Sequence, residues 1–202
     1  PSAKLVIDAD LRQFGYDIFA DNPFSLTSES LEQMLKSDNS NDLLQKEIDN
    51  IEKIKDYVED LFDAKDPSIA KIVKSAESNC RDMTDLLLRL RYAKRRYNYN
   101  WTAKSDDMLS LMNKFGIDVK ELKEAVVNGN TKTMQDYANV LEKASDALMN
   151  NINMIKKEEN IYGILFFKTD LYLQMEKDID NARIYINKLR SGNIQEIKTQ
   201  LL

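Results

Sequence analysis

Residues 67–90 read PSIAKIVKSAESNCRDMTDLLLRL, and their apolar members recur every three or four positions. This seam consists of Ile69, Ile72 or Val73, Ala76, Cys80, Met83, Leu87 and Leu90. Such spacing puts apolar side chains on one face of an α-helix, which predicts a long amphipathic helix packed against other helices. Asp66-Pro67 supports this prediction, because an Asp cap followed by Pro is a common helix start. Cys80 is predicted to be a small core residue rather than a reactive thiol.

The same spacing recurs elsewhere in the chain. It predicts four long helices, at 42–63, 67–98, 131–158 and 161–190. Shorter helices are expected after Thr27 or Ser28, at 106–115 behind a Ser105 cap, and from Asp118 to Asn128, with a looser one at 194–202. Asp42 is the expected cap of the first long helix. Gly116 is expected to end its helix in the left-handed conformation, and Gly192 is expected to close the last long helix.

Composition agrees with this pattern. The 202 residues include only 5 Gly and 3 Pro, so tight turns are few and the elements must be long. We therefore predict an all-α fold with more than about 60% helix. The expected architecture is an antiparallel four-helix-type bundle of long helices, with short inserted helices and an aromatic N-terminal arm.

The arm is residues 1–26, and the helical bundle is residues 27–202. The arm lacks a clear helical period and is rich in large apolar side chains: Phe14, Tyr16, Ile18, Phe19 and Phe24. These side chains are expected to lie either on the chain's own bundle or on a partner.

Catalytic chemistry has little support in the sequence. The chain has no His, which removes the commonest general base and zinc ligand. It has no phosphate-binding glycine motif and no nucleophile motif. The apolar seams contain no inward-facing acid that could hold a metal. We therefore expect neither an enzyme nor a protein with a bound metal or cofactor.

One basic, aromatic stretch stands out, at residues 89–101 (RLRYAKRRYNYNW). It concentrates positive charge in a chain whose net charge is -5. The candidate ligand-binding residues are Arg89, Tyr92, Arg95, Arg96 and Trp101. Arg binds carboxylate and phosphate through two hydrogen bonds, so a small anion or an acidic partner could bind here. Alternatively, the cations only complement the negative end of the helix, while Tyr97 and Trp101 pack beneath it. Nucleic acid is not expected, because so short a patch offers few phosphate contacts.

Two resemblances accompany these patterns. Residues 86–107, where LLLRLRYAKRRY precedes a polar run, resemble extracytoplasmic sensory four-helix bundles of bacterial chemoreceptors and sensor histidine kinases. That resemblance implies a small anionic ligand bound between helices, often across a homodimer. Residues 14–19 (FGYDIF) with Pro23 are similar to the N-terminal box of bacterial outer-membrane polysaccharide export proteins. The sequence after this box does not resemble the β-rich domain of those proteins.

Two functions follow as expectations. The first is a ligand- or partner-binding bundle, such as the sensory domain of a bacterial receptor for a small anion. The second is a structural or secreted adaptor that docks another protein through its aromatic arm and basic stretch. No apolar run reaches the ~18 residues of a membrane span, so any membrane attachment is expected through flanking segments. The first function implies an extracytoplasmic location.

Overall fold

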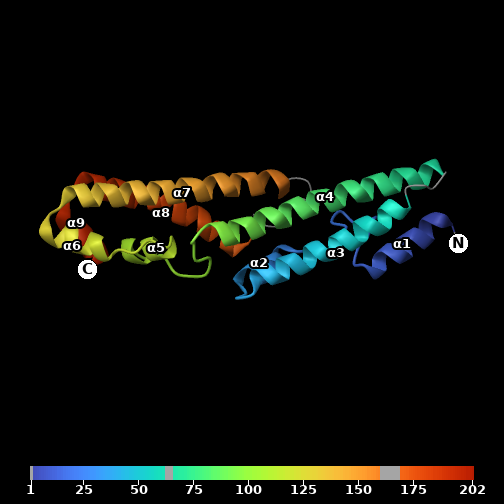
Figure 1. Cartoon of the computed structure of the whole chain (residues 1–202), viewed down its shortest axis with the longest axis horizontal. Coiled ribbons are helices and arrows are strands. Elements are labelled where there is room, and N and C mark those ends of the chain that lie inside the picture. The colour runs from blue at the N-terminus through green and yellow to red at the C-terminus, as the bar shows by residue number, and fades with distance from the viewer. Residues whose placement is uncertain (1, 62–65, 160–168) are drawn as a thin grey trace. The chain divides into compact units, whose positions relative to one another are not determined.

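The computed structural model describes residues 2–61, 66–159 and 169–202. Helices make up 77% of the structure, and the described residues contain no strand, so the predicted all-α fold is confirmed. The helices in these ranges are α1 (Ala3–Gln13), α2 (Ser28–Lys36), α3 (Ser40–Asp60), α4 (Pro67–Arg96), α5 (Met108–Lys114), α6 (Lys120–Asn128), α7 (Thr131–Glu159), α8 (Asp170–Ser191) and α9 (Ile194–Leu201) (Figure 1). Over the same ranges, no helix has the length and apolar character needed to cross a membrane.

The chain forms two compact units. Unit 1 is Pro1–Tyr92 with Met154–Lys168, and unit 2 is Ala93–Asn153 with Thr169–Leu202. Helices α4 and α7 each contribute residues to both units. The predicted division at residue 26 does not coincide with this boundary, because the arm, α2 and α3 all belong to unit 1.

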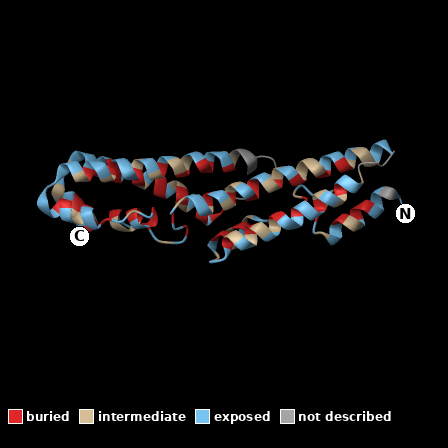
Figure 2. Cartoon of the chain, viewed as in Figure 1, coloured by how far each residue is buried: buried red, intermediate tan, exposed pale blue. Residues whose placement is uncertain are grey.

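In unit 1, α3 and the first part of α4 run side by side in opposite directions (Figure 1). The Lys55 ammonium on α3 is close enough to Cys80 on α4 to act on it electrostatically. The core residues of α3 recur every three or four positions between exposed ones (Figure 2): Leu44, Ile48, Ile51, Ile54 and Val58. From α4 the core takes the predicted seam from residue 73 on, namely Val73, Ala76, Cys80, Met83, Leu87 and Leu90, whereas the first seam position, Ile69, is only half-buried.

Cys80 is 0% exposed, which confirms its prediction as a core residue. Burial raises the pKa of its thiol to about 12, so the thiol stays protonated at neutral pH.

In unit 2, α7 and α8 are antiparallel. Arg190 Nη1 lies 3.0 Å from Glu142 Oε2, and Arg183 Nη2 lies 2.9 Å from Met149 Sδ. From the first contact to the second, the residue number falls on α8 and rises on α7, as antiparallel pairing requires. Helix α9 packs against α5, α6 and α8. This arrangement buries Leu171, Met175, Ala182 and Leu189 of α8.

The arm was predicted without helical period, and this is wrong for its first half. Ala3–Gln13 form α1, whose first turn is capped by the Ser2 hydroxyl accepting from Leu5 N at 3.4 Å. Ile7 and Leu11, one turn apart, are buried in unit 1. The buried face of this short helix has only these two apolar residues, and so short a repeat does not predict a helix from the sequence alone.

Two predicted helix caps are also wrong. Helix α3 begins at Ser40, two residues before Asp42, and its N-cap Asn39 makes no side-chain capping bond. Helix α5 is capped by Asp107 instead of Ser105. The Asp107 carboxylate accepts from Ser110 N at 2.7 Å, and Asp107 N donates to Ser110 Oγ at 3.0 Å. Ser105 lies two residues before this cap, and its hydroxyl donates to Asp178.

With the exception of the start of the last long helix, the remaining boundaries agree with the sequence pattern to within a few residues. Gly116 is left-handed with a φ of 72°, as predicted, and Gly192 closes the last long helix, as predicted, with a φ of 71°. Gly129 ends α6 in the same conformation. The last long helix was predicted from residue 161, but α8 starts at Asp170 behind a Thr169 cap. Residues 160–168, which include the first part of the predicted helix at 161–190, lie outside the described residues.

Candidate functional site

The residues predicted as one binding site divide between the two units. Arg89 is half-buried and Tyr92 is 54% exposed, and both belong to unit 1. Arg95 and Arg96 are exposed and Trp101 is only 3% exposed, and these three belong to unit 2. Of the five predicted binding residues, only Arg95 and Arg96 are therefore exposed, basic and part of the same unit.

Trp101 is part of the core of unit 2. Its ring meets Tyr99 edge-on at a centroid distance of 6.3 Å, and Tyr99 in turn meets Phe115 at 5.2 Å. Lys94 Nζ lies 5.4 Å from the centroid of the Trp101 ring. These contacts agree with the alternative in which Trp101 packs beneath the end of the basic helix. Trp101 is therefore not available to a ligand from solvent.

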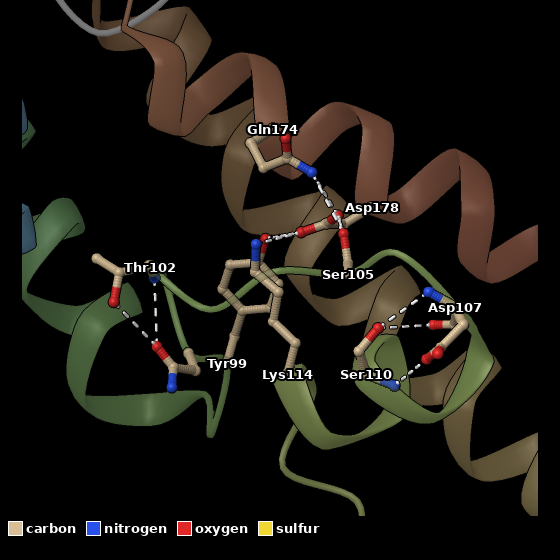
Figure 3. A network of polar contacts seen from close by, with 9 residues as sticks. Tyr99, Thr102, Ser105, Asp107, Ser110, Lys114, Gln174 and Asp178 are labelled. Carbon is tan, nitrogen blue, oxygen red and sulfur yellow. Dashed lines mark hydrogen bonds and ion pairs between the residues drawn. The ribbon is translucent and has the colours of Figure 1, made fainter. Parts of the chain in front are cut away.

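A buried polar cluster in unit 2 surrounds Asp178 of α8 (Figure 3). Lys114 Nζ lies 2.7 Å from Asp178 Oδ2, and Gln174 Nε2 donates to Asp178 Oδ1 at 2.9 Å. The hydroxyls of Tyr99 and Ser105 also donate to this carboxylate. Lys114 Nζ also lies 5.2 Å from the centroid of the Tyr99 ring. The cluster thus ties α8 to α5 and to the segment between α4 and α5.

The Asp178 cluster is closed to solvent. Asp178 is 0% exposed and Lys114 is 1% exposed, so a substrate would have no access to the carboxylate. Burial raises the pKa of Tyr99, and the neighbouring Asp178 carboxylate raises it further. A phenol that keeps its proton is suited to donating a hydrogen bond. The cluster is therefore a structural element of unit 2.

The sequence analysis missed this cluster, and its statement that the seams hold no inward-facing acid is wrong. Asp178 lies on the α8 seam itself, which steps by four and three through Leu171, Met175, Asp178, Ala182, Ile186 and Leu189. The 3/4 spacing could have revealed the acid if polar residues had been counted along with apolar ones. Three of its partners, Tyr99, Ser105 and Lys114, however, come from positions more than sixty residues earlier in the chain.

Unit 1 contains an open pocket of about 400 Å³, which we call the arm pocket. That volume lies within the range of about 300–1,000 Å³ typical of small-molecule sites. One wall comes from the arm: Lys4, Tyr16, Ile18 and Phe19. The other comes from α4, at positions spaced along one helical face: Ser68, Lys71, Ile72, Ser75, Ala76 and Asn79.

Contacts within unit 1 hold the two walls of the arm pocket together. Asn79 Nδ2 donates to the Tyr16 hydroxyl oxygen at 3.0 Å. Tyr16 is 1% exposed, and its ring meets Phe24 edge-on at 5.1 Å. Burial raises the pKa of Tyr16 to about 12. Thus Tyr16 and Phe24 of the arm pack on the chain's own unit, whereas Phe19 remains 56% exposed.

The charged groups that line the arm pocket are both cationic. Lys4 Nζ lies 5.0 Å from the centroid of the Phe19 ring, and Lys71 is exposed on the α4 wall. None of the ten lining residues is Asp or Glu. The nearest acid in sequence to that end of α4 is Asp66, whose Oδ1 accepts from Ser68 N and Ser68 Oγ at 2.9 and 2.8 Å.

No group of three or more acidic or Cys side chains gathers as a metal site in the part of the chain that the structure describes. Comparison with known proteins adds no relative: no family model, no curated protein and no solved structure matches this chain. The function must therefore be argued from the residues themselves.

Proposed function

We propose that this chain is a non-enzymatic, helical ligand-binding protein and that its ligand occupies the arm pocket. The observation that carries the proposal is the pocket's construction from two elements far apart in sequence. Tyr16 and Asn79, which are joined by a hydrogen bond, hold its walls together. The pocket has apolar walls, polar groups at a few positions, and a volume suited to a small molecule.

The lining residues support binding rather than catalysis. The chain has no His, and the pocket offers hydroxyl, amide and ammonium groups beside apolar side chains. A ligand that contacts both the arm and α4 would favour the arrangement of unit 1 in which the two are closed together. That property suits the sensory role implied by the resemblance to receptor bundles.

A second candidate is the docking of an acidic partner on the basic end of α4. Arg95 and Arg96 favour it because both are exposed in an otherwise acidic chain. A small ligand and an acidic partner would thus bind to different units, and mutations can separate the two functions.

The test is a calorimetric and thermal-shift screen with amphiphiles of one chain length: decanoate, decanol and decyltrimethylammonium. Ser75→Trp places an indole in the arm pocket from an exposed position, and we expect it to reduce ligand affinity at least about ten-fold by occupying the space. Ser191→Trp adds the same indole at an exposed position of unit 2 and should leave affinity unchanged.

Charge reversal at Arg95 and Arg96 tests the second candidate in the same assay. If Arg95→Glu with Arg96→Glu abolishes binding while Ser75→Trp does not, the basic end is the binding site. If none of the three amphiphiles binds, or if Ser75→Trp binds them as the unchanged chain does, the arm pocket is not a ligand site and our proposal is wrong.

A further inference from the structure

Building on the proposed function, we infer that the arm pocket selects an amphiphilic anion. In this arrangement Lys4 and Lys71 bind a carboxylate or similar oxyanion, and the apolar walls enclose a hydrocarbon body. The two lysines come from opposite walls, one from α1 and one from α4. An anion between them would therefore be held from both sides.

The charge of the lining favours this ligand class. The lining carries two positively charged groups, the ammonium groups of Lys4 and Lys71. None of the ten lining residues has a carboxylate that could neutralise them. A cation would meet repulsion from both lysines. A neutral amphiphile would gain apolar contacts but no charge-assisted hydrogen bond, which is roughly twice as strong as a neutral one.

The apolar side chains of the lining favour anions with a hydrocarbon body over hydrophilic anions. Ile18 and Ile72 are half-buried and Phe19 is 56% exposed, so these side chains form an apolar wall that still contacts water. A small hydrophilic anion such as citrate would leave this wall uncovered. An anion with a hydrocarbon body would remove it from water, which stabilises the complex.

Lys4 is already positioned by the pocket. Its ammonium lies 5.0 Å from the centroid of the Phe19 ring, within the range of a cation–π contact. Such a contact at an exposed site is weak, so it guides the ammonium without fixing it. An arriving carboxylate can therefore draw Lys4 toward itself at little cost, while Phe19 remains as an apolar surface beside the ligand.

The ligand is a free small molecule rather than a bilayer lipid. The arm pocket offers about 400 Å³ between two walls, which suits a single hydrocarbon body. Binding to a bilayer would instead use a flat apolar surface. Vesicles of anionic phospholipid provide the matching comparison in the experiment.

The test compares decanoate with decanol by calorimetry on the full chain. We expect decanoate to bind at least about ten-fold more tightly, because only the carboxylate gains charge-assisted contacts. Lys4→Gln with Lys71→Gln should weaken decanoate binding by a similar factor and leave decanol binding unchanged. The control is Lys46→Gln with Lys53→Gln, which removes the same two charges from exposed positions on α3 outside the pocket lining.

The outcomes separate this inference from the proposed function. If decanol binds as tightly as decanoate and Ser75→Trp weakens both, the pocket is a ligand site but is not selective for anions. The inference is also overturned if the α3 control weakens decanoate as much as the pocket variant does, since bulk charge would then explain the effect. Binding to anionic vesicles without binding to free decanoate would overturn it as well.

Discussion

Asp178 is fully buried among groups that donate to it or carry positive charge. Lys114 provides the charge, and Tyr99, Ser105 and Gln174 provide hydrogen bonds. A buried carboxylate is tolerable only when its partners replace the water it has lost. The same holds for Lys114, which is 1% exposed and has Asp178 as its ion-pair partner. The two side chains should therefore behave as one energetic unit.

We predict that removing either charge alone is strongly destabilising. Asp178→Asn or Lys114→Met should each lower the free energy of unfolding by about 3–5 kcal/mol, because each leaves the other charge buried without a counter-ion. The double variant should cost clearly less than the two single losses together. Chemical denaturation of the four proteins measures this coupling.

The control is the exposed pair Arg190–Glu142, at 3.0 Å between α8 and α7. Removing both of its charges should change stability much less than either buried variant does, since water replaces the lost contact. If the losses at Asp178 and Lys114 are simply additive, the cluster is a set of independent contacts and our account of it is wrong.

At the scale of elements, α5 depends on how its two ends are closed. Asp107 and Ser110 cap its start reciprocally, and Gly116 follows its end with a φ of 72°. A Cβ at Gly116 would lie 2.5 Å from Asn98 Cβ and 2.8 Å from Asn98 O. Gly116 is therefore required both by its backbone conformation and by the close approach of the segment after α4.

Gly116→Ala should accordingly destabilise the chain more than Gly15→Ala. Both glycines have positive φ, which costs a side-chain-bearing residue about 1–2 kcal/mol. At Gly15 no atom lies within 4 Å of the added Cβ, so only this conformational cost applies. At Gly116 the clash with Asn98 adds to it. Equal losses of unfolding free energy in the two variants would show that the Asn98 contact relaxes freely.

The elements also show where sequence reasoning succeeded. The seam of α4 and the ends of α5 and α6 were predicted from local rules, because apolar spacing and left-handed glycines act within a few residues. Helix α1 was missed because its buried face holds little more than Ile7 and Leu11. The Ser105 cap was wrong because Asp107 and Ser110 form the capping box of α5, while the Ser105 hydroxyl donates to Asp178, 73 positions away.

At the scale of the whole molecule, the candidate site could not be found from local pattern. The arm pocket joins residues of the arm to α4, and the Tyr16–Asn79 bond spans 63 positions. The basic stretch at 89–101 was singled out because its positive charges are close together in the sequence itself. The pocket's two lysines, 67 positions apart, look like ordinary surface residues until the fold brings them together.

Both units contain buried phenol or thiol groups with raised pKa values, and these groups should lower the stability of the fold at alkaline pH. Burial raises the pKa of Tyr16 from its ordinary value of 10.0 to about 12 and that of Cys80 from 9.0 to about 12. Tyr99 of unit 2 is shifted in the same direction. In each case the unfolded chain releases the proton at a lower pH than the folded chain does.

The sign of the effect follows from this difference in bound protons. Below about pH 9 both states keep these protons, so stability does not depend on them. Between about pH 10 and 12 the folded chain retains protons that the unfolded chain has lost, and the free energy of unfolding falls as pH rises. Each such group contributes a slope of up to about 1.4 kcal/mol per pH unit in its window.

We therefore expect denaturation midpoints to be flat from pH 7 to about 9 and to decline steeply above about pH 10. Tyr16→Phe should start from a lower stability, because Asn79 loses its hydrogen-bond acceptor, but its decline should be shallower. Cys80→Ala should remove the part of the decline that begins near pH 9. Helicity and tyrosinate absorbance, followed together, distinguish unfolding from simple titration. A decline of equal slope in all three proteins would mean that groups other than Tyr16 and Cys80 govern the alkaline limit of the fold.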